Sequence, residues 1–203
     1  MTQAAPQFAT LPFATLADRA RTVCAAATSR TTDNGQPFLL VPAADLPALA
    51  QFLRDDAALR FDALMDLTGF DLLKYPKAET PNAIAVLYLL FSYRHRHRLQ
   101  LRVLAPRELC TVPTVSAIWP AALYFEREVF DLLGVTFTGH PSLQRIMNPT
   151  DWEGHPLRKD YVYPDAYHGV AHLREGQHFE TNPPRAGDPP PPAAAPKPPG
   201  GHA

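Results

Sequence analysis

The 203-residue sequence has only two cysteines, Cys24 and Cys110, and neither stands in a CxxC or CxxH pair. A disulfide framework is therefore not expected, and this cysteine usage indicates a reducing compartment. An iron–sulfur cluster usually needs about four thiolate ligands, which this chain alone does not supply. The formal net charge of −1 gives no electrostatic reason to expect nucleic acid or anionic lipid as a partner.

Long apolar runs and nucleotide motifs are also missing. The longest nearly unbroken apolar run, 83–91, has nine residues, whereas a helix that spans a bilayer needs about 20. Residues 1–15 show no basic region followed by an apolar stretch, so we expect no signal peptide. Because GxGxxG, P-loop and HExxH patterns are absent, no nucleotide or zinc-protease site is predicted. Any association with a membrane is expected to be indirect, through a partner.

Apolar periodicity predicts an α+β fold of two layers, with helices packed on a mixed sheet. The expected helices cover 16–28, 42–54 and 121–133, and the expected strands cover 38–41, 61–73, 82–93 and 99–104. Thr15 and Pro42 fit the starts of the first two helices, and Gly134 fits the end of the third. Thr114 can cap a further helical stretch that Pro120 interrupts. The basic link 94–98 predicts that the last two strands form an antiparallel hairpin.

The domain pattern has four parts. Residues 1–14 are expected to be flexible, 15–165 to form the α+β domain, and 166–182 to be an irregular extension. Nine of the 21 residues in 183–203 are proline, which predicts a disordered tail rather than a ligand for an SH3-like domain. The stretch 135–163 has little periodicity and is expected to be a long irregular C-terminal arm that binds something.

The third expected helix is strongly charged. Glu126, Arg127, Glu128 and Asp131 crowd one segment, and residues three or four apart share a helix face. The following arm supplies candidate cations, namely His140, Arg145, His155, Arg158 and Lys159. We predict that this acidic ridge is latched to the arm by charge-assisted hydrogen bonds. The alternative is an ordinary solvated charged face.

Two further interpretations involve chemistry at these residues. His95 and His97 alternate, and more histidines follow downstream, so a zinc site is conceivable on residue type. Glu128 and Asp131 could in principle serve as paired acid–base carboxylates. Both interpretations are weaker than the latch, because the histidines lack a ligand spacing typical of zinc and no substrate pocket can be named. The histidines of the two GHP strings precede proline, which favours turns where a ring can serve as a hydrogen-bonding post.

One string of motifs carries a family resemblance. The segments are EREVFDLLGV from Glu126, FTGHPSLQRIM from Phe137 and DWEGHPLRKDY from Asp151, preceded by VPTVSAIWPAA from Val112. Together they closely resemble the C-type, 30 kDa subunit family of complex I, the respiratory NADH:quinone oxidoreductase, and the likeness runs over about 53–163. The resemblance implies a scaffold in the peripheral arm without redox cofactors of its own, since FMN and the iron–sulfur clusters belong to partner subunits.

The resemblance also implies partners and place. The expected partners are the quinone-site (D-type) subunit and the cluster-bearing B- and I-type subunits, on the cytoplasmic side of the bacterial inner membrane. Activity then belongs to the assembly, and no catalytic or metal-binding residue is expected in this chain. An equivalent subunit of a membrane-bound hydrogenase or a ferredoxin- or F420-linked complex is the alternative. The expected structural and interface residues are Trp119, Glu126, Arg127, Glu128, Asp131, Gly134, His140, Arg145, Trp152, His155, Arg158, Lys159, Asp160 and Tyr161.

Overall fold

The computed structural model describes residues 10–75, 80, 82–164 and 166–171. The chain divides into two compact units, residues 1–161 and 162–203. The expected tail 183–203 lies outside the described residues, as do 1–9 and 172–182. In the second unit, β8 (Ala166–Tyr167) and β9 (Val170–Ala171) pair as a short antiparallel hairpin.

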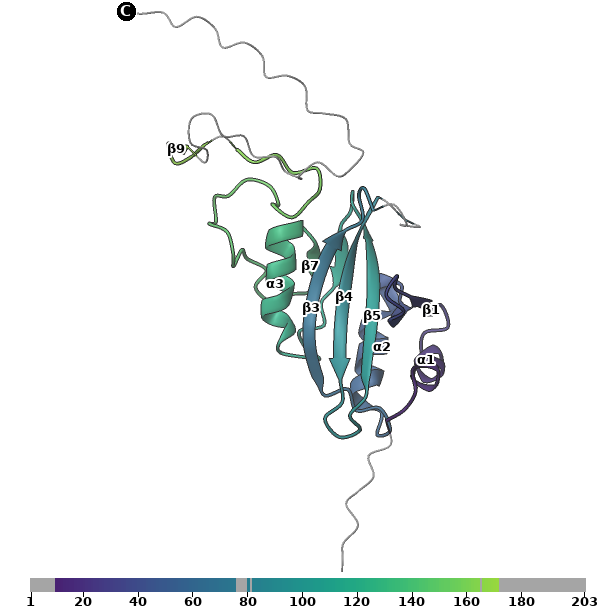
Figure 1. Ribbon diagram of the computed structural model, residues 1–203. Helices are drawn as coiled ribbons and strands as arrows, with labels where there is room; N and C mark the ends of the chain where they lie inside the picture. The colour runs from purple at the N-terminus through teal and green to yellow at the C-terminus, as the bar shows by residue number, and fades with distance from the viewer. Residues whose placement is uncertain (1–9, 76–79, 81, 165, 172–203) are drawn as a thin grey trace, which may run out of the picture. The chain divides into compact units, whose positions relative to one another are not determined.

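A mixed five-stranded sheet is the centre of the first unit (Figure 1). Its order is β1-β2-β5-β4-β3, and the bounds are β1 Thr28–Thr31, β2 Pro37–Leu40, β3 Ala63–Asp71, β4 Ala83–Phe91 and β5 Arg98–Pro106. β2 and β5 run parallel, and the other neighbours are antiparallel. The predicted α+β fold with a mixed sheet is confirmed.

The β4–β5 hairpin shows why the sheet has two different faces. Tyr88 pairs with Leu101 and Val86 with Val103, and all four side chains are buried on one face. Because side chains alternate along a strand, the intervening residues lie on the other face and are partly or well exposed. They are Leu87, Leu89, Gln100, Arg102 and Leu104. The predicted hairpin and its alternation are confirmed.

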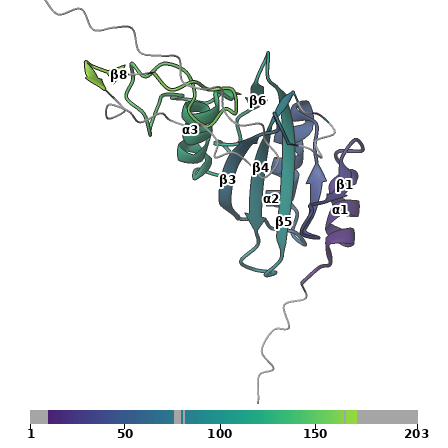
Figure 2. The same cartoon turned by 45° about the horizontal axis from the view of Figure 1, so that its top comes forward.

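Helices cover the buried face (Figures 1 and 2). The helices are α1 Phe13–Arg21, α2 Leu46–Asp55 and α3 Ala122–Leu133. In both views α2 lies behind the sheet, and α3 packs along β3. The predicted apolar stripe of α2, Leu46, Leu49, Ala50 and Leu53, is completely buried in the main core. None of the described helices is long and apolar enough to cross a membrane.

The bounds of two helices differ from the prediction. The first helix starts at Phe13 after Pro12, so Thr15 lies inside it and does not cap it, and residues 13–14 are not flexible ends. It stops at Arg21, and Thr28 already belongs to β1, because pairing with β2 overrides the helix propensity of the alanine-rich segment. Pro42 precedes only a 3-10 turn, η1 (Ala43–Asp45). The α-helix begins only at Leu46, because Pro47 has no N–H to donate to the Ala43 carbonyl.

The segment after Thr114 also differs, because it forms turns and no regular helix. The Thr114 hydroxyl accepts the Ser116 N–H at 3.1 Å, so it caps a single turn. Like β1, the short strands on either side of α3 were not predicted: β6 (Thr111–Pro113) and β7 (Thr136–Thr138), which pair in parallel. Their pairing joins the segments that lead into and out of α3, which fixes the start of the arm.

Candidate functional site

Helix α3 is placed closely against the sheet. Val129 and Leu133 are buried, and a Cβ on Gly69 of β3 would lie 2.5 Å from Leu133 Cδ1. Gly69 therefore allows the helix to approach the strand. The helix ends as predicted at Gly134, which adopts the left-handed conformation with φ 73°. The part of the predicted arm that follows β7, residues 139–161 (hereafter the arm), packs around this end of the helix.

Asp131 is the centre of the contact between α3 and the arm. Its side chain has no exposed surface, and it accepts the backbone N–H groups of Ile146, Met147 and Asn148 at 3.0, 2.7 and 2.8 Å. Asn148 Nδ2 and Arg145 Nη1 donate to its other oxygen at 2.9 and 2.6 Å. Burial alone would raise the pKa of Asp131, but these hydrogen bonds outweigh burial and hold the pKa well below its usual range.

The last carbonyls of α3 accept hydrogen bonds from the arm. His155 Nδ1 donates to the Asp131 carbonyl at 2.9 Å, Arg158 Nε to the Leu133 carbonyl at 2.7 Å, and Arg145 Nη1 to the Asp131 carbonyl at 3.2 Å. These groups satisfy acceptors that a helix leaves open, and two are cations at the negative end of the helix dipole. Burial lowers the pKa of His155, against the raising effect of its hydrogen bond to the Asp131 carbonyl. The predicted role of His155 as a hydrogen-bonding post is confirmed.

Gly134 is needed by this cap for a second reason. A Cβ there would lie 2.5 Å from His155 Cδ2 and 2.7 Å from Arg158 Nη2. His140 also joins the arm to α3, at the start of the arm. Its Nε2 donates to the Leu123 carbonyl at 3.1 Å, and its Nδ1 accepts the Ser142 N–H at 3.0 Å.

Glu126 was predicted to belong to an acidic ridge that contacts the arm, but it does not contact the arm. It has no exposed surface and turns away from the arm. Its carboxyl group meets the Thr114 hydroxyl at 2.5 Å and the Val115 N–H at 2.8 Å. Burial raises the pKa of Glu126 to about 7, against the lowering effect of these two hydrogen bonds. Helical spacing places three carboxylates on one segment, but the surrounding chain encloses two of them.

The other two charged residues of α3 face the surface. Arg127 reaches the arm through backbone carbonyls, with Nε–O 3.0 Å to Gln144 and Nη2–O 3.1 Å to Arg145. Glu128 is exposed, and it forms no hydrogen bond or ion pair within the described residues. The arm is therefore bound to α3, as predicted. Among the residues described, however, only Asp131–Arg145 is an ion pair between α3 and the arm. Most of the other contacts join side chains to backbone.

The end of the arm is fixed to the sheet by residues that the sequence did not single out. Asp71, at the end of β3, accepts the Lys159 N–H at 2.8 Å. Arg107 pairs with Asp71 and, at 2.5 Å, with Asp160. The signal available in the sequence was weak, because a lone aspartate after a strand is a common turn residue.

The aromatic residues divide between core and surface. Trp119 is 2% exposed and donates its Nε1–H to the Phe61 carbonyl at 2.8 Å. It is a core residue, so of the structural and interface roles expected for it, its burial supports the structural one. Trp152 is partly buried, and the Tyr161 hydroxyl donates to the Glu153 carbonyl at 3.1 Å. Within the arm, the exposed apolar side chains are Ile146, Met147 and Leu157 (40%, 62% and 52% exposed).

The residues considered for metal binding or acid–base catalysis have other roles in the structure. His95 Nε2 contacts the Ala57 carbonyl at 3.0 Å, and His97 Nε2 contacts the Leu59 carbonyl at 2.7 Å. No group of three or more metal-ligating side chains occurs in the part of the chain that the structure describes. Asp131 is enclosed by its hydrogen bonds, while Glu128 points to the surface, so the two do not form a carboxylate pair.

The chain is similar to known proteins in both sequence and fold. The family described as "Respiratory-chain NADH dehydrogenase, 30 Kd subunit" matches residues 39–167. A Roseiflexus castenholzii protein, named as the C subunit of an NADH-quinone oxidoreductase, is 49% identical over 113 residues, covering 55% of this chain and 62% of the relative. A protein of the same name from Acidithiobacillus ferrooxidans is 44% identical over 139 residues, covering 66% and 68%. This chain thus spans about three fifths of the Roseiflexus relative's length.

Two solved structures are similar. A trypsin-resistant fragment of Nqo5 is 31% identical with a TM-score of 0.54, covering 64% of this chain and 98% of the fragment. A chain of an archaeal membrane-bound sulfane sulfur reductase is 21% identical with a TM-score of 0.59, covering 73% and 85%, and shows the shared fold alone. The family match extends from β2 through α3 and the whole arm. The chain therefore belongs to the family of respiratory-chain NADH dehydrogenase 30 kDa subunits.

Proposed function

We propose that this chain is the C-type subunit in the peripheral arm of a proton-translocating NADH:quinone oxidoreductase. In this role it carries no redox cofactor. It docks against the quinone-site subunit and the cluster-bearing subunits, which hold the FMN-to-quinone electron path. It lies at the cytoplasmic side of the bacterial inner membrane and meets the membrane only through the complex. The names of its relatives support this assignment.

The observation that supports a docking role is the state of the arm. An irregular segment of this length would ordinarily move, yet its polar groups are tied to α3 and the sheet. At the same time Met147 and Leu157 remain exposed. A pre-ordered segment with exposed apolar groups suits binding, because its ordering cost has been met before the partner arrives. Charged side chains at the rim, such as Glu128, then select the partner.

Co-purification from native membranes tests the proposal. A tagged chain should recover a quinone-site subunit and cluster-bearing subunits, identified by mass, and the donor follows from whether a flavin-bearing partner is among them. Recovery of the chain as a monomer that turns over a redox substrate would contradict the proposal.

A charge reversal sharpens the test of the docking surface. Glu128→Lys should lower recovery of the partners by about tenfold or more, while the stability of the isolated chain changes by no more than about 0.5 kcal/mol. Asp18→Lys, at an exposed carboxylate on α1, is the matched control and should leave recovery unchanged. Equal recovery with both variants would remove Glu128 from the docking surface. Arg158→Glu is less informative, because Arg158 caps α3 from within the chain.

A further inference from the structure

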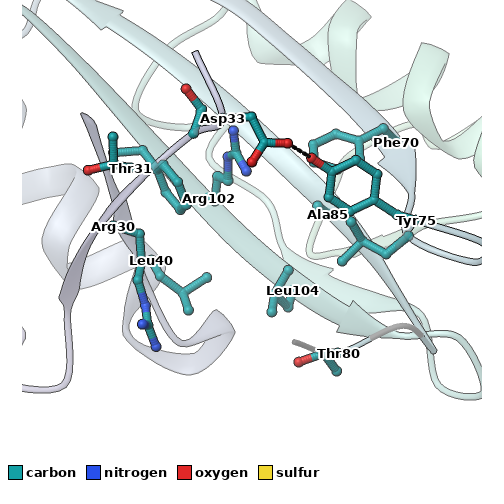
Figure 3. A pocket seen from close by; sticks show the side chains of 13 residues that line it. Arg30, Thr31, Asp33, Leu40, Phe70, Tyr75, Thr80, Ala85, Arg102 and Leu104 are labelled. Atoms are coloured by element: carbon teal, nitrogen blue, oxygen red, sulfur yellow. Dashed lines mark hydrogen bonds between the residues drawn. The ribbon is translucent and has the colours of Figure 1, made fainter. Parts of the chain in front are cut away.

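The face of the sheet opposite the helices carries a cavity of about 270 Å³ (Figure 3). Aromatic and aliphatic side chains line it, among them Phe38, Leu40, Phe70, Tyr75 and Leu104, together with three threonines, two arginines (Arg30 and Arg102) and one carboxylate, Asp33. Pockets for small molecules usually measure roughly 300–1,000 Å³. The cavity is at or below that range, which favours a single inserted side chain over a cofactor-sized molecule.

Arg102 dominates the chemistry of this cavity. Its guanidinium carbon lies 3.8 Å from the centre of the Phe38 ring and 5.5 Å from the centre of the Phe70 ring. Figure 3 shows Arg102 on one side of the cavity, with Phe70 and Tyr75 on the other. A guanidinium stacked on an aromatic ring keeps its N–H groups in its own plane, where they can bind a carboxylate in a forked geometry.

This cation has no counter-ion within the described residues. Its Nε is enclosed without a hydrogen-bond partner, and no ion pair joins Arg102 to a described carboxylate. Asp33 also lines the cavity, but its carboxylate accepts the Tyr75 hydroxyl at 2.6 Å. Burial lowers the pKa of Arg102, against a smaller raising effect of Tyr75. A partly desolvated cation is costly unless something pairs with it.

We propose that the Arg102 cavity binds an aspartate or glutamate side chain from a neighbouring subunit, presented on a segment whose apolar residues cover Leu40, Leu87 and Leu104. The argument for this occupant is charge complementarity: the described lining holds two arginines against one aspartate, and the guanidinium of Arg102 lies against the Phe38 and Phe70 rings, which suits a carboxylate flanked by apolar groups. This second docking face lies on the side of the sheet away from α2. The proposal relies on the proposed function only for the source of the carboxylate, a subunit of the same complex.

Photo-crosslinking in the assembled complex tests this site. A diazirine-bearing residue at position 104 should form a crosslink to a partner peptide that contains Asp or Glu. Arg102→Gln should reduce the crosslink yield by about tenfold or more, and Arg102→Lys by less, since lysine keeps the charge but not the fork. Arg98→Gln is the matched control, because Arg98 lies on the same strand and face and also approaches an aromatic ring, Phe91, at 5.9 Å. It should leave the yield within about twofold of wild type.

The isolated full chain separates binding from a purely structural role. Arg102→Gln should melt no lower than Arg98→Gln, because it removes a cation that lacks a counter-ion among the described residues. A lower Tm for Arg102→Gln would overturn the proposal, as would equal crosslink yields or a complex that assembles without any crosslink from position 104. If inorganic phosphate raises the Tm of the wild type but not of Arg102→Gln, and no crosslink forms, the occupant is a small anion and the proposal is wrong. In these cases co-purification through the arm can still succeed, so failure here is distinct from failure of the proposed function.

Discussion

The sheet and the arm are held in place by opposite means. The sheet is stabilised by backbone ladders and by a core of buried aliphatic and aromatic side chains spread over many residues. The arm has no ladder of its own among its described residues, and it is fixed by a few polar groups, chiefly Asp131, Arg145, His155 and Arg158. A structure that depends on many apolar contacts tolerates single changes better than one that depends on a few charged groups. The arm should therefore be releasable by one substitution while the sheet stays folded.

Asp131→Ala should have the largest effect, because it should release the arm while the sheet stays folded. It removes the acceptor of five hydrogen bonds and leaves Arg145 without its ion-pair partner. The loss should be about 3–5 kcal/mol, the range for breaking a buried pair. Hydrogen exchange should show residues 144–158 opening while β4 and β5 stay protected, with Glu128→Gln as the control. Simultaneous loss of protection in the sheet would show that the two regions are not separable.

The pH dependence of stability separates the two buried carboxyls of α3. Burial raises the pKa of Glu126 from 4.5 to about 7, so between these values the folded chain binds more protons than the unfolded chain. The contribution of Glu126 is therefore fully present below pH 4.5 and is lost as pH rises through about 7, an effect of about 3 kcal/mol. Asp131 has the opposite sign: its lowered pKa means that its contribution is lost only in acid.

Urea unfolding of wild type and Glu126→Gln at pH 5 and pH 8 measures the Glu126 effect. The wild type should lose more stability than the variant over this interval. An identical pH slope would mean that Glu126 is ionised in the folded chain throughout, which would contradict its raised pKa.

Gly134→Ala should act at the junction between the two regions. The left-handed conformation costs about 1 kcal/mol for alanine, and the new methyl group would press on His155 and Arg158. Gly35→Ala is the control, because Gly35 has a similar φ of 76° but open space around it. The stability difference between the two variants, measured by urea unfolding, reports the contact with the arm. Equal losses would show that the arm moves aside without cost.

Arg127→Ala should have the smallest effect. Its two hydrogen bonds to arm carbonyls are partly exposed, so the loss should be about 0.5–1.5 kcal/mol. Faster hydrogen exchange confined to residues 143–146, with a Tm lowered by about 2–4 °C, is the expected result. A loss as large as that of Asp131→Ala would mean that surface contacts hold the arm as firmly as buried ones.

Periodic patterns in the sequence predicted much of the fold because they record burial directly. The alternation in 99–104, the helical stripe of α2 and the glycine at the end of α3 each reflect one local rule. The short strands β1, β6 and β7 were missed, since their sequences TSRT, TVP and TFT hold no apolar run, whereas the equally short β2 carries the run Phe38–Leu40. The role of Asp71 and Arg107 was missed for a similar reason, because they act on Lys159 and Asp160, which are more than 50 residues away in the sequence.

The sequence by itself determined the fold class, the hairpin, the end of α3 and the motifs that mark the family. It also determined that charged residues of α3 and the arm would meet. Only the tertiary structure decided which charges are buried, because burial depends on the segments that close over a helix from elsewhere in the chain. Thus Glu126 and Asp131, five positions apart on one helix, have pKa values shifted in opposite directions. Asp131 receives five donors including a cation, whereas Glu126 receives two neutral ones, and that difference in partners is set by the fold.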